Sequence, residues 1–193
     1  MTAFTHETLS RTERYAGKIF SVYSDEVTMS SGGTAHRDVV ENKGAVGIVA
    51  LDDSGRVVLI KQYRHAVRRK LWELPAGLLD VPGEEPLVAA ARELGEEADL
   101  RAARFDLLVD LHTSPGFSNE SIRIFLARQL SPVPEKDRHQ RTDEEADLEI
   151  AWFDLDEAVG MVFRGEITNA AAVGGLLAAA RARDGGWAAL RPV

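Results

Sequence analysis

Hydrophobic and polar residues alternate in three short runs near the N-terminus, and this pattern predicts β-strands at residues 14–22, 24–29 and 34–41. The Ser-Ser-Gly-Gly sequence at 30–33 favours a hairpin turn between the second and third strands. Strands this short need another surface to bury one face of their sheet. We therefore expect residues 1–43 to form a small antiparallel sheet that packs on a neighbouring domain or subunit.

Beyond a candidate boundary at Lys43-Gly44, apolar runs bounded by turn residues predict further strands. The predicted strands cover residues 45–51, 56–63, 72–77, 105–111, 121–130 and 149–154. The polar segment 131–145 carries two prolines and many charges, and it predicts a long loop between the last two strands.

In residues 86–98, the spacing of apolar residues changes to the period of an α-helix. Pro86 suits a first helical turn, and an apolar stripe at positions i, i+3, i+4 and i+7 follows it. The stripe consists of Leu87, Ala90, Ala91 and Leu94. Residues 156–163 and 169–183 predict two more helices, the second rich in alanine. Residues 44–193 are therefore expected to form one α+β domain.

Composition narrows the functional classes. The 193 residues are 45% hydrophobic and 28% charged, as in ordinary globular proteins. The absence of Cys excludes a disulfide scaffold, a Cys-ligated zinc site and a thiol nucleophile, and it is compatible with the cytoplasm. No signal peptide or bilayer-spanning run is recognisable. The net charge of −8 argues against nucleic acid or an anionic membrane as a partner, although a cation can bridge an acidic protein to a phosphorylated ligand.

Three glutamates in the predicted helix 86–98 carry the candidate chemistry. Glu93, Glu96 and Glu97 are spaced so that all three project towards one side. Each like-charge pair destabilises a helix by about 0.2–0.5 kcal/mol, and Arg92 alone does not neutralise three carboxylates. A hard divalent cation such as Mg²⁺ favours oxygen ligands and can neutralise the remaining negative charge. An acidic, solvated helix face is the ordinary alternative.

The residues upstream favour the metal site. Gly77 is followed after six residues by Glu84 and after seven more by the sequence Arg-Glu-Leu-x-Glu-Glu-x-Asp-Leu at 92–100. This resembles the Nudix box, in which Gly is followed after five residues by Glu and after seven more by Arg-Glu-apolar-x-Glu-Glu-x-Gly-apolar. One extra residue falls in the turn at 81–83, where a loop absorbs it. Asp99 replaces the last Gly, and Asp tolerates the left-handed conformation expected there.

The resemblance implies the Nudix fold, a mixed β-sheet sandwiched between helices, and hydrolysis of a nucleoside diphosphate linked to another group. It implies that Glu93 and Glu97 are the principal metal ligands, that Glu96 is a further ligand or holds a water, and that the Ala76 carbonyl is a backbone ligand. Arg92 matches the residue that orients these carboxylates. The implied cofactor is Mg²⁺, with Mn²⁺ as a substitute.

Two segments outside the box resemble the ADP-ribose pyrophosphatase subfamily. They are Leu-Trp-Glu-Leu-Pro-Ala-Gly at 71–77 and Ser-Pro-Gly-Phe-Ser-Asn-Glu at 114–120, where Pro115 lies fifteen residues beyond Leu100. This resemblance implies that ADP-ribose is hydrolysed to AMP and ribose 5-phosphate. It also implies a homodimer in which the element at 1–43 contributes to the partner's substrate pocket.

Candidate substrate contacts follow from the same resemblance. Arg64 is expected to contact phosphate or ribose oxygens, and Arg37 to do so from the partner subunit. Phe20 is expected to stack on adenine, and Glu120 to accept from ribose hydroxyls. The ordinary alternatives are a core aromatic, two surface charges and a turn cap.

The resemblance also implies a glutamate base, on a loop before a late strand, that deprotonates the nucleophilic water. The acidic sequence at 143–147 fits in two registers, which favour either Glu144 or Glu145. An acidic loop without a catalytic role is the alternative.

Two rival functions share the motif. One is hydrolysis of another nucleotide sugar or of an oxidised nucleotide. The other is a non-catalytic Nudix domain that senses ADP-ribose, against which the intact set of Arg92 and three glutamates argues.

Overall fold

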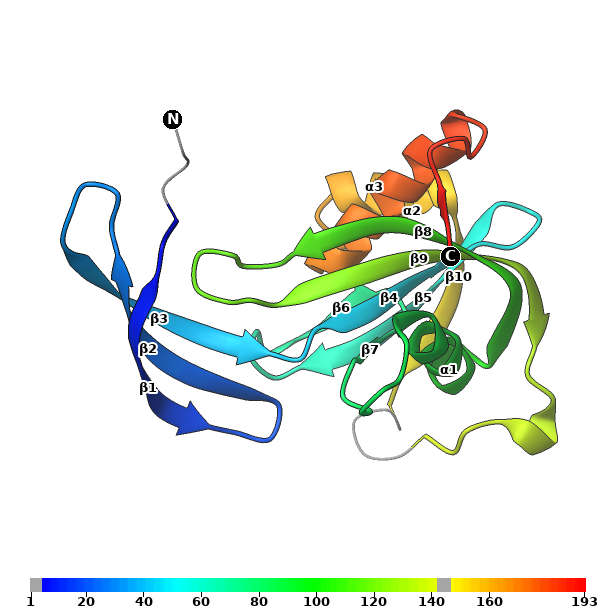
Figure 1. Ribbon diagram of the computed structural model, residues 1–193. Coiled ribbons are helices and arrows are strands. Elements are labelled where there is room, and N and C mark those ends of the chain that lie inside the picture. Colours follow the sequence, from blue (N-terminus) through cyan, green and yellow to red (C-terminus); the bar gives the residue numbers. More distant parts are fainter. Residues whose placement is uncertain (1–4, 142–146) are drawn as a thin grey trace. The chain divides into compact units, whose positions relative to one another are not determined.

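The computed structural model describes residues 5–141 and 147–193 (Figure 1). The chain divides into two compact units. The first consists of Met1–Gly44 and His112–Ser121, and the second of Ala45–Leu111 and Ile122–Val193. No helix in the described ranges is long and apolar enough to cross a membrane.

The N-terminal unit contains the predicted three-stranded antiparallel sheet. Its strands are β1 (Thr8–Ala16), β2 (Phe20–Thr28) and β3 (Thr34–Asn42), with β2 in the middle. The hairpin turn between β2 and β3 is confirmed. Gly32 and Gly33 adopt φ values of 88° and 79° there, a conformation that glycine accepts without strain.

The first strand lies earlier than the sequence pattern predicts. β1 begins at Thr8, and the predicted strand at 14–22 contains the turn between β1 and β2, where the Gly17 amide donates to the Phe20 carbonyl at 2.9 Å. Every residue of β1 is exposed, so no apolar alternation marks it. A polar pair holds the strand instead, since Arg11 donates two 2.8 Å hydrogen bonds to the buried carboxylate of Asp25.

Residues 112–121 join this unit through β3, which the sequence pattern did not predict. Val40 donates to the Phe117 carbonyl at 2.8 Å and accepts from the Asn119 amide at 3.2 Å. The Asn119 side chain accepts from the Asn42 amide at 2.7 Å. These contacts join residues more than 70 positions apart, which local periodicity does not reveal.

The second unit contains two sheets. The larger has the order β11 (Arg191–Pro192), β8 (Leu100–His112), β9 (Ser121–Pro132), β4 (Ala45–Ala50) and β7 (Ala76–Leu78). The smaller has the order β10 (Glu149–Asp154), β5 (Arg56–Arg64) and β6 (Arg69–Glu73). β4 pairs parallel with β9 and antiparallel with β7, so the larger sheet is mixed.

Helices cover both sides of these strands. Figure 1 shows α1 (Pro86–Ala98) on one side and α2 (Leu155–Phe163) and α3 (Ala170–Asp184) on the other. β4 is buried on both faces: Val46 and Ile48 belong to the core beneath α1, whereas Val49 belongs to the core beneath α2 and α3. The predicted α+β sandwich of a mixed sheet between helices is confirmed.

Several boundaries differ from those predicted. The predicted strand at 72–77 is two strands, β6 and β7, in different sheets, and Pro75, which has no amide hydrogen to donate, lies between them. β8 and β9 are longer than predicted: β8 begins five residues earlier, at Leu100, and β9 continues to Pro132. The loop predicted at 131–145 contains a short 3₁₀ helix, η1 (Glu135–Asp137), and β11 was not predicted.

Leu94→Ala tests the packing of α1. The Leu94 side chain is fully buried, and its truncation leaves a cavity, so we expect a loss of about 2–5 kcal/mol in the free energy of unfolding. Val88→Ala on the same helix is the control, because Val88 is 56% exposed and its loss should cost little. Urea unfolding measures both, and equal losses would contradict this packing.

Candidate active site

Helix α1 presents its charged residues in its last two turns. The helix begins with Pro86 after the extended Glu85 and ends at Asp99, which adopts the left-handed conformation with φ 55° and ψ 34°. The Asp99 amide donates to the Leu94 carbonyl and closes the helix. The expectation that Asp replaces Gly at a left-handed position is thus confirmed.

Glu97 lies at the inner edge of the charged face. Leu94 and Ala98 on the neighbouring positions are buried against the sheet, and Glu97 itself is only 6% exposed. Its carboxylate accepts a 2.8 Å hydrogen bond from the Ala76 amide of β7. This bond holds the end of α1 beside the strand whose Ala76 carbonyl is a predicted ligand.

Gly77 provides the space that Glu93 occupies. A Cβ atom built at Gly77 would overlap the Glu93 side chain, including its carboxylate. A side chain at position 77 would displace Glu93 from this position, which gives a physical reason for glycine at this place in the motif. The structure therefore places Glu93 and Glu97 beside the neighbouring residues Gly77 and Ala76 of β7.

Arg92 holds three carboxylates. It donates to Glu84 through Nε at 3.1 Å and through Nη2 at 3.0 Å. Its Nη1 donates to Glu93 at 2.6 Å and to Glu96 at 3.1 Å. Hydrogen bonding to Arg92 holds the pKa of the Glu84 carboxyl below its ordinary value, and these carboxylates together raise the pKa of Arg92.

The donor chemistry of this cluster fits a hard divalent cation. The three glutamates and the Ala76 carbonyl offer oxygen atoms alone, which Mg²⁺ and Mn²⁺ prefer. Among the described residues, no group of three acidic, His or Cys side chains converges closely enough to hold a metal ion in this conformation. The Arg92 guanidinium donates to Glu93 and Glu96 and offsets their negative charge.

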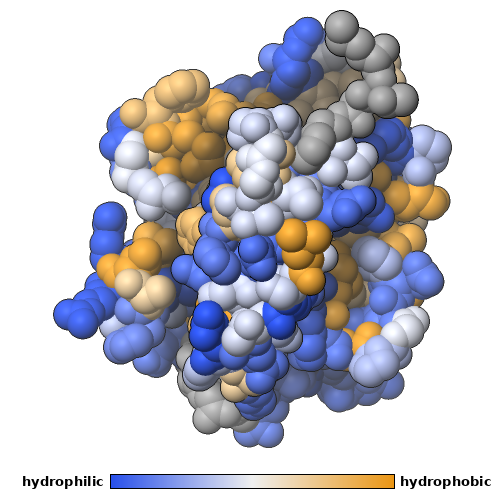
Figure 2. All heavy atoms as spheres, turned by 60° about the vertical axis from the view of Figure 1, so that its left-hand side comes forward, coloured by the Kyte–Doolittle hydropathy of each residue, from blue (hydrophilic) through white to orange (hydrophobic). Residues whose placement is uncertain are grey.

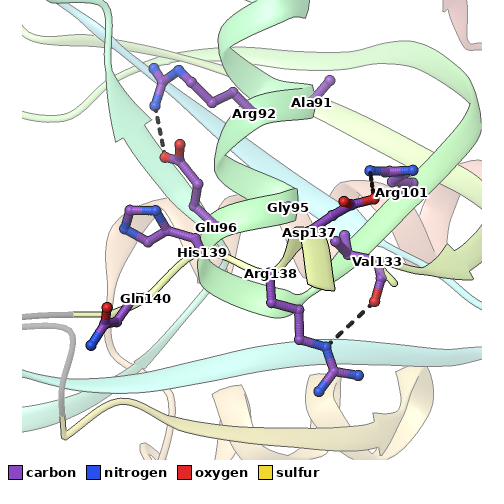
Figure 3. Close-up of a pocket in the computed structure, with 10 residues that line it drawn as sticks. All are labelled: Ala91, Arg92, Gly95, Glu96, Arg101, Val133, Asp137, Arg138, His139 and Gln140. Carbon is purple, nitrogen blue, oxygen red and sulfur yellow. Dashed lines mark hydrogen bonds and ion pairs between the residues drawn. The ribbon is translucent and has the colours of Figure 1, made fainter. Parts of the chain in front are cut away.

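A cavity of about 470 Å³ lies beside the cluster (Figure 3). One wall is the α1 face with Ala91, Gly95 and Glu96. The other comes from the segment 133–140 that surrounds η1, together with Arg101 at the start of β8. The carboxylate of Glu96 is thus accessible from this cavity, with its side chain 32% exposed.

The predicted substrate contacts fall in both units. In the second unit, Arg64 donates to the buried carboxylate of Glu73 through Nε at 3.0 Å and Nη2 at 2.6 Å. In the N-terminal unit, Phe20 is 41% exposed, and Arg37 is exposed with a 2.8 Å hydrogen bond to the His36 carbonyl.

Glu120, also in the N-terminal unit, accepts from the Thr113 hydroxyl. Glu144 and Glu145, the two candidate bases, lie outside the described residues. The roles of all these residues stay predictions.

Three residues at the site were not among the predicted site residues. Glu84 was part of the motif spacing, and that spacing could have identified it as a partner of Arg92. Glu73 and Arg141 do not belong to the spaced positions of the motif, so the sequence contains no indication of their contacts. Arg141 reaches back over 40 positions to Asp99 at 2.7 Å, and a polar loop sequence does not reveal such a contact.

Comparison with known proteins agrees with this fold and this helix. The family model for the NUDIX domain matches residues 41–173, which is most of the chain, and the protein therefore belongs to the Nudix family. Nudix hydrolases generally need a divalent metal ion, usually Mg²⁺.

Two relatives and one solved structure are similar over most of their length. An ADP-ribose pyrophosphatase from Mycobacterium tuberculosis is 49% identical over 187 residues, which cover 97% of this chain and 88% of that protein. One from Bacillus subtilis is 33% identical over 170 residues, 88% of this chain and 90% of that protein. A crystal structure of an ADP compounds hydrolase has a TM-score of 0.81 at 23% identity, covers 96% of this chain and 98% of its own, and shows the fold alone.

Arg92→Met tests the charge balance of the cluster. The pKa of Glu84 is lowered in the folded protein, so its stabilising effect is present above the unfolded value of about 4.3 and is lost as the pH falls through the folded value. The difference in free energy of unfolding between wild type and Arg92→Met should therefore shrink as the pH falls from about 5 to about 3.

Urea unfolding across that range measures the difference. Leu94→Ala is the control, because a truncated apolar side chain should give a difference that does not depend on pH. A constant difference for Arg92→Met would show that ion pairing to Arg92 does not stabilise this helix.

Proposed function

We propose that this protein hydrolyses the pyrophosphate bond of ADP-ribose to AMP and ribose 5-phosphate in a Mg²⁺-dependent reaction. The observation that carries this proposal is that Glu93 and Glu97 of the Nudix-like motif lie against β7. Glu93 occupies the space beside Gly77, and Glu97 accepts from the Ala76 amide. The 49% identity to an ADP-ribose pyrophosphatase over nearly the whole chain supports the choice of substrate.

Each charged residue of α1 has a proposed role. Glu93, Glu97 and Glu96, with the Ala76 carbonyl, would hold the metal. When bound there, Mg²⁺ lowers the pKa of a bound water and offsets charge that develops on the phosphates. Arg92, through its hydrogen bonds to Glu93 and Glu96, fixes the orientation of the ligands, and Glu84 fixes Arg92 in turn.

The remaining roles are proposed on the same basis. Glu144 or Glu145 takes the proton of the attacking water. Arg64 binds phosphate or ribose oxygens, and its ion pair with Glu73 sets the plane of the guanidinium while the side chain stays 45% exposed.

For the substrate groups further from the reacting phosphates, Phe20 stacks on adenine, Glu120 accepts from ribose hydroxyls, and Arg37 acts from the partner subunit. These roles depend on the proposed dimer.

We also propose that the N-terminal unit mediates a homodimer. Its sheet and the turn between β1 and β2 expose large apolar side chains, with Leu9 and Tyr15 each 54% exposed, Ile19 57% and Phe20 41%. On the face drawn in Figure 2, hydrophobic residues gather in several patches among hydrophilic ones. Exposed apolar surface of this kind is typical of an interaction site.

Chromatographic detection of AMP released from ADP-ribose, with Mg²⁺ and with EDTA, tests the proposed function. A panel of other nucleotide sugars and oxidised nucleotides tests the substrate. If another compound of this panel is hydrolysed faster than ADP-ribose, that compound is the preferred substrate and the protein is a different Nudix hydrolase. Tight binding of ADP-ribose without turnover of any substrate would indicate a sensor, and would contradict the enzyme.

Glu97→Gln tests the metal ligand. Gln retains an acceptor for the Ala76 amide, so the fold should persist, but the ligand charge is lost. We expect turnover to fall by at least about a hundredfold, since even residues that only support ligands alter activity by about 10–100-fold. Glu85→Gln is the control, because it removes the same charge from the exposed start of the same helix. Near-normal rates for Glu97→Gln at saturating Mg²⁺ would exclude Glu97 as a ligand.

Light scattering after size exclusion tests the dimer. We expect a mass of twice the 21.1 kDa chain for wild type, and the monomer mass for Ile19→Glu, which places a charge in the proposed interface. Phe163→Glu is the control, because Phe163 is 79% exposed at the end of α2 in the other unit. A monomeric wild type, or dissociation by Phe163→Glu alone, would contradict the proposed interface.

A further inference from the structure

A cluster of basic side chains lies on the hairpin formed by β5 and β6. Residues 57–72 contain no Asp or Glu and five cationic side chains, although the whole chain has a net charge of −8. These side chains are Lys61, Arg64, Arg68, Arg69 and Lys70. A positive patch on an acidic protein raises the local concentration of anions, so the hairpin favours an anionic ligand.

The strand pairing separates these cations onto the two faces of the smaller sheet. Successive side chains of a strand point to opposite faces, so Val58 and Arg64 share one face of β5. Arg69 of β6 is the cross-strand partner of Arg64 and lies on that face too. Val58 belongs to the core that contains Leu94 of α1. Arg64 and Arg69 therefore lie on the face of this sheet that packs toward α1.

The cations on the two faces differ in their partners. On the face away from α1, Lys70 donates to Glu149 at 3.3 Å. On the face toward α1, Arg64 donates to the buried carboxylate of Glu73, as described above. Arg69 is exposed and forms no hydrogen bond or ion pair with any residue that the structure describes. Because like charges directly opposite each other destabilise a pair of strands, the two arginines leave positive charge that an anion can offset.

The chain places this charge close to the proposed metal site. Glu73, to which Arg64 donates at 2.6 Å, precedes Ala76 by three residues. Three residues span at most about 10–11 Å, so Arg64 lies near the strand whose Ala76 carbonyl is a proposed ligand. The backbones of Arg64 and Arg69 are one strand spacing apart, about 5 Å. Two adjacent phosphate groups bound beside the metal site therefore lie within reach of both guanidinium groups.

We propose that Arg69, together with Arg64, binds the two phosphates of the substrate. A guanidinium presents a planar fork of N–H donors that matches the oxygen atoms of a phosphate group. Glu73 occupies part of the Arg64 fork, whereas no described carboxylate competes for the donors of Arg69. Arg69 is then a substrate-binding residue that lies outside the Nudix motif. The proposal rests on the function proposed above and adds to it a second contact for the diphosphate.

Arg69→Gln tests this contact. The variant removes a charge-assisted hydrogen bond, so KM for ADP-ribose should rise by about 10–100-fold, while kcat changes by less than about threefold. Calorimetry with α,β-methylene ADP-ribose, in which a CH₂ group replaces the bridging oxygen, measures binding without turnover. The affinity for this analogue should fall about as much as KM rises. Mn²⁺ affinity measured by electron paramagnetic resonance should be unchanged, because Arg69 is not a proposed ligand.

Two further variants separate a phosphate contact from a loss of structure. Lys70→Gln is the matched control, because it removes the same charge from the next residue of β6, on the opposite face of the sheet. It should leave KM within about twofold of wild type, since an exposed ion pair contributes little. Arg69→Lys should recover part of the affinity for the analogue, because it restores the charge without the forked donors. Without ligand, Arg69→Gln should resist urea at least as well as wild type, because it removes a like charge opposite Arg64.

Ionic strength distinguishes a direct contact from attraction by the patch as a whole. Salt screens attraction between separated, exposed charges, so the ratio of KM between Arg69→Gln and wild type should persist from about 0.05 M to about 0.5 M NaCl if the contact is direct. An unchanged KM for Arg69→Gln would overturn the proposal. Equal effects of Arg69→Gln and Lys70→Gln that disappear at high salt would also overturn it, and would indicate diffuse attraction instead.

The same measurements keep this proposal separate from the proposed function. If wild type releases AMP and Arg69→Gln binds the analogue normally, the hydrolase stands and the second phosphate contact is wrong. If wild type releases no AMP but its binding of the analogue depends on Arg69, the hydrolase is wrong and the diphosphate site stands.

Discussion

The contact between one guanidinium and three carboxylates is the constraint on which the site depends. The carboxylates of Glu84, before α1, and of Glu93 and Glu96, on α1, would repel one another, and Arg92 lets them lie together by donating to each. Because this cation belongs to the helix itself, it offsets part of the repulsion among the carboxylates. The same arrangement presents oxygen atoms to a divalent cation at the edge of the cavity.

Strand β7 provides two features that hold the glutamates of α1 in position. β7 contributes a glycine with no side chain, beside which Glu93 packs, and an amide that holds the nearly buried Glu97. Leu94, three residues before Glu97 on the same helix, is buried in the core, so the packing that stabilises the domain also sets the distance from helix to strand. Stability and site geometry therefore depend on the same few contacts.

Much of this arrangement follows from the sequence, because its signals are local. The helix at 86–98 was predicted with its observed bounds, since an apolar stripe, an initial proline and a left-handed Asp99 mark it within a few residues. β1 was misplaced because it buries no side chain and is held by the Arg11–Asp25 pair instead. The association of 112–121 with β3 depends on distant contacts that no local period records.

The same contrast applies to the site. Glu93 and Glu97 were identified because the motif fixes their spacing, and the space at Gly77 gives that spacing a physical reason. Arg141 was missed because its partner Asp99 lies 42 positions away, and the choice between Glu144 and Glu145 depends on a segment outside the described residues.

The central claim is that the carboxylates of α1 hold the metal that the reaction needs. Anomalous diffraction from crystals soaked in Mn²⁺ tests it most directly, because the signal locates the ion without reference to activity. We expect a peak within coordination distance of Glu93 and Glu97, near the Ala76 carbonyl, which Glu93→Gln weakens. A peak elsewhere in the molecule with none beside α1 would contradict the account.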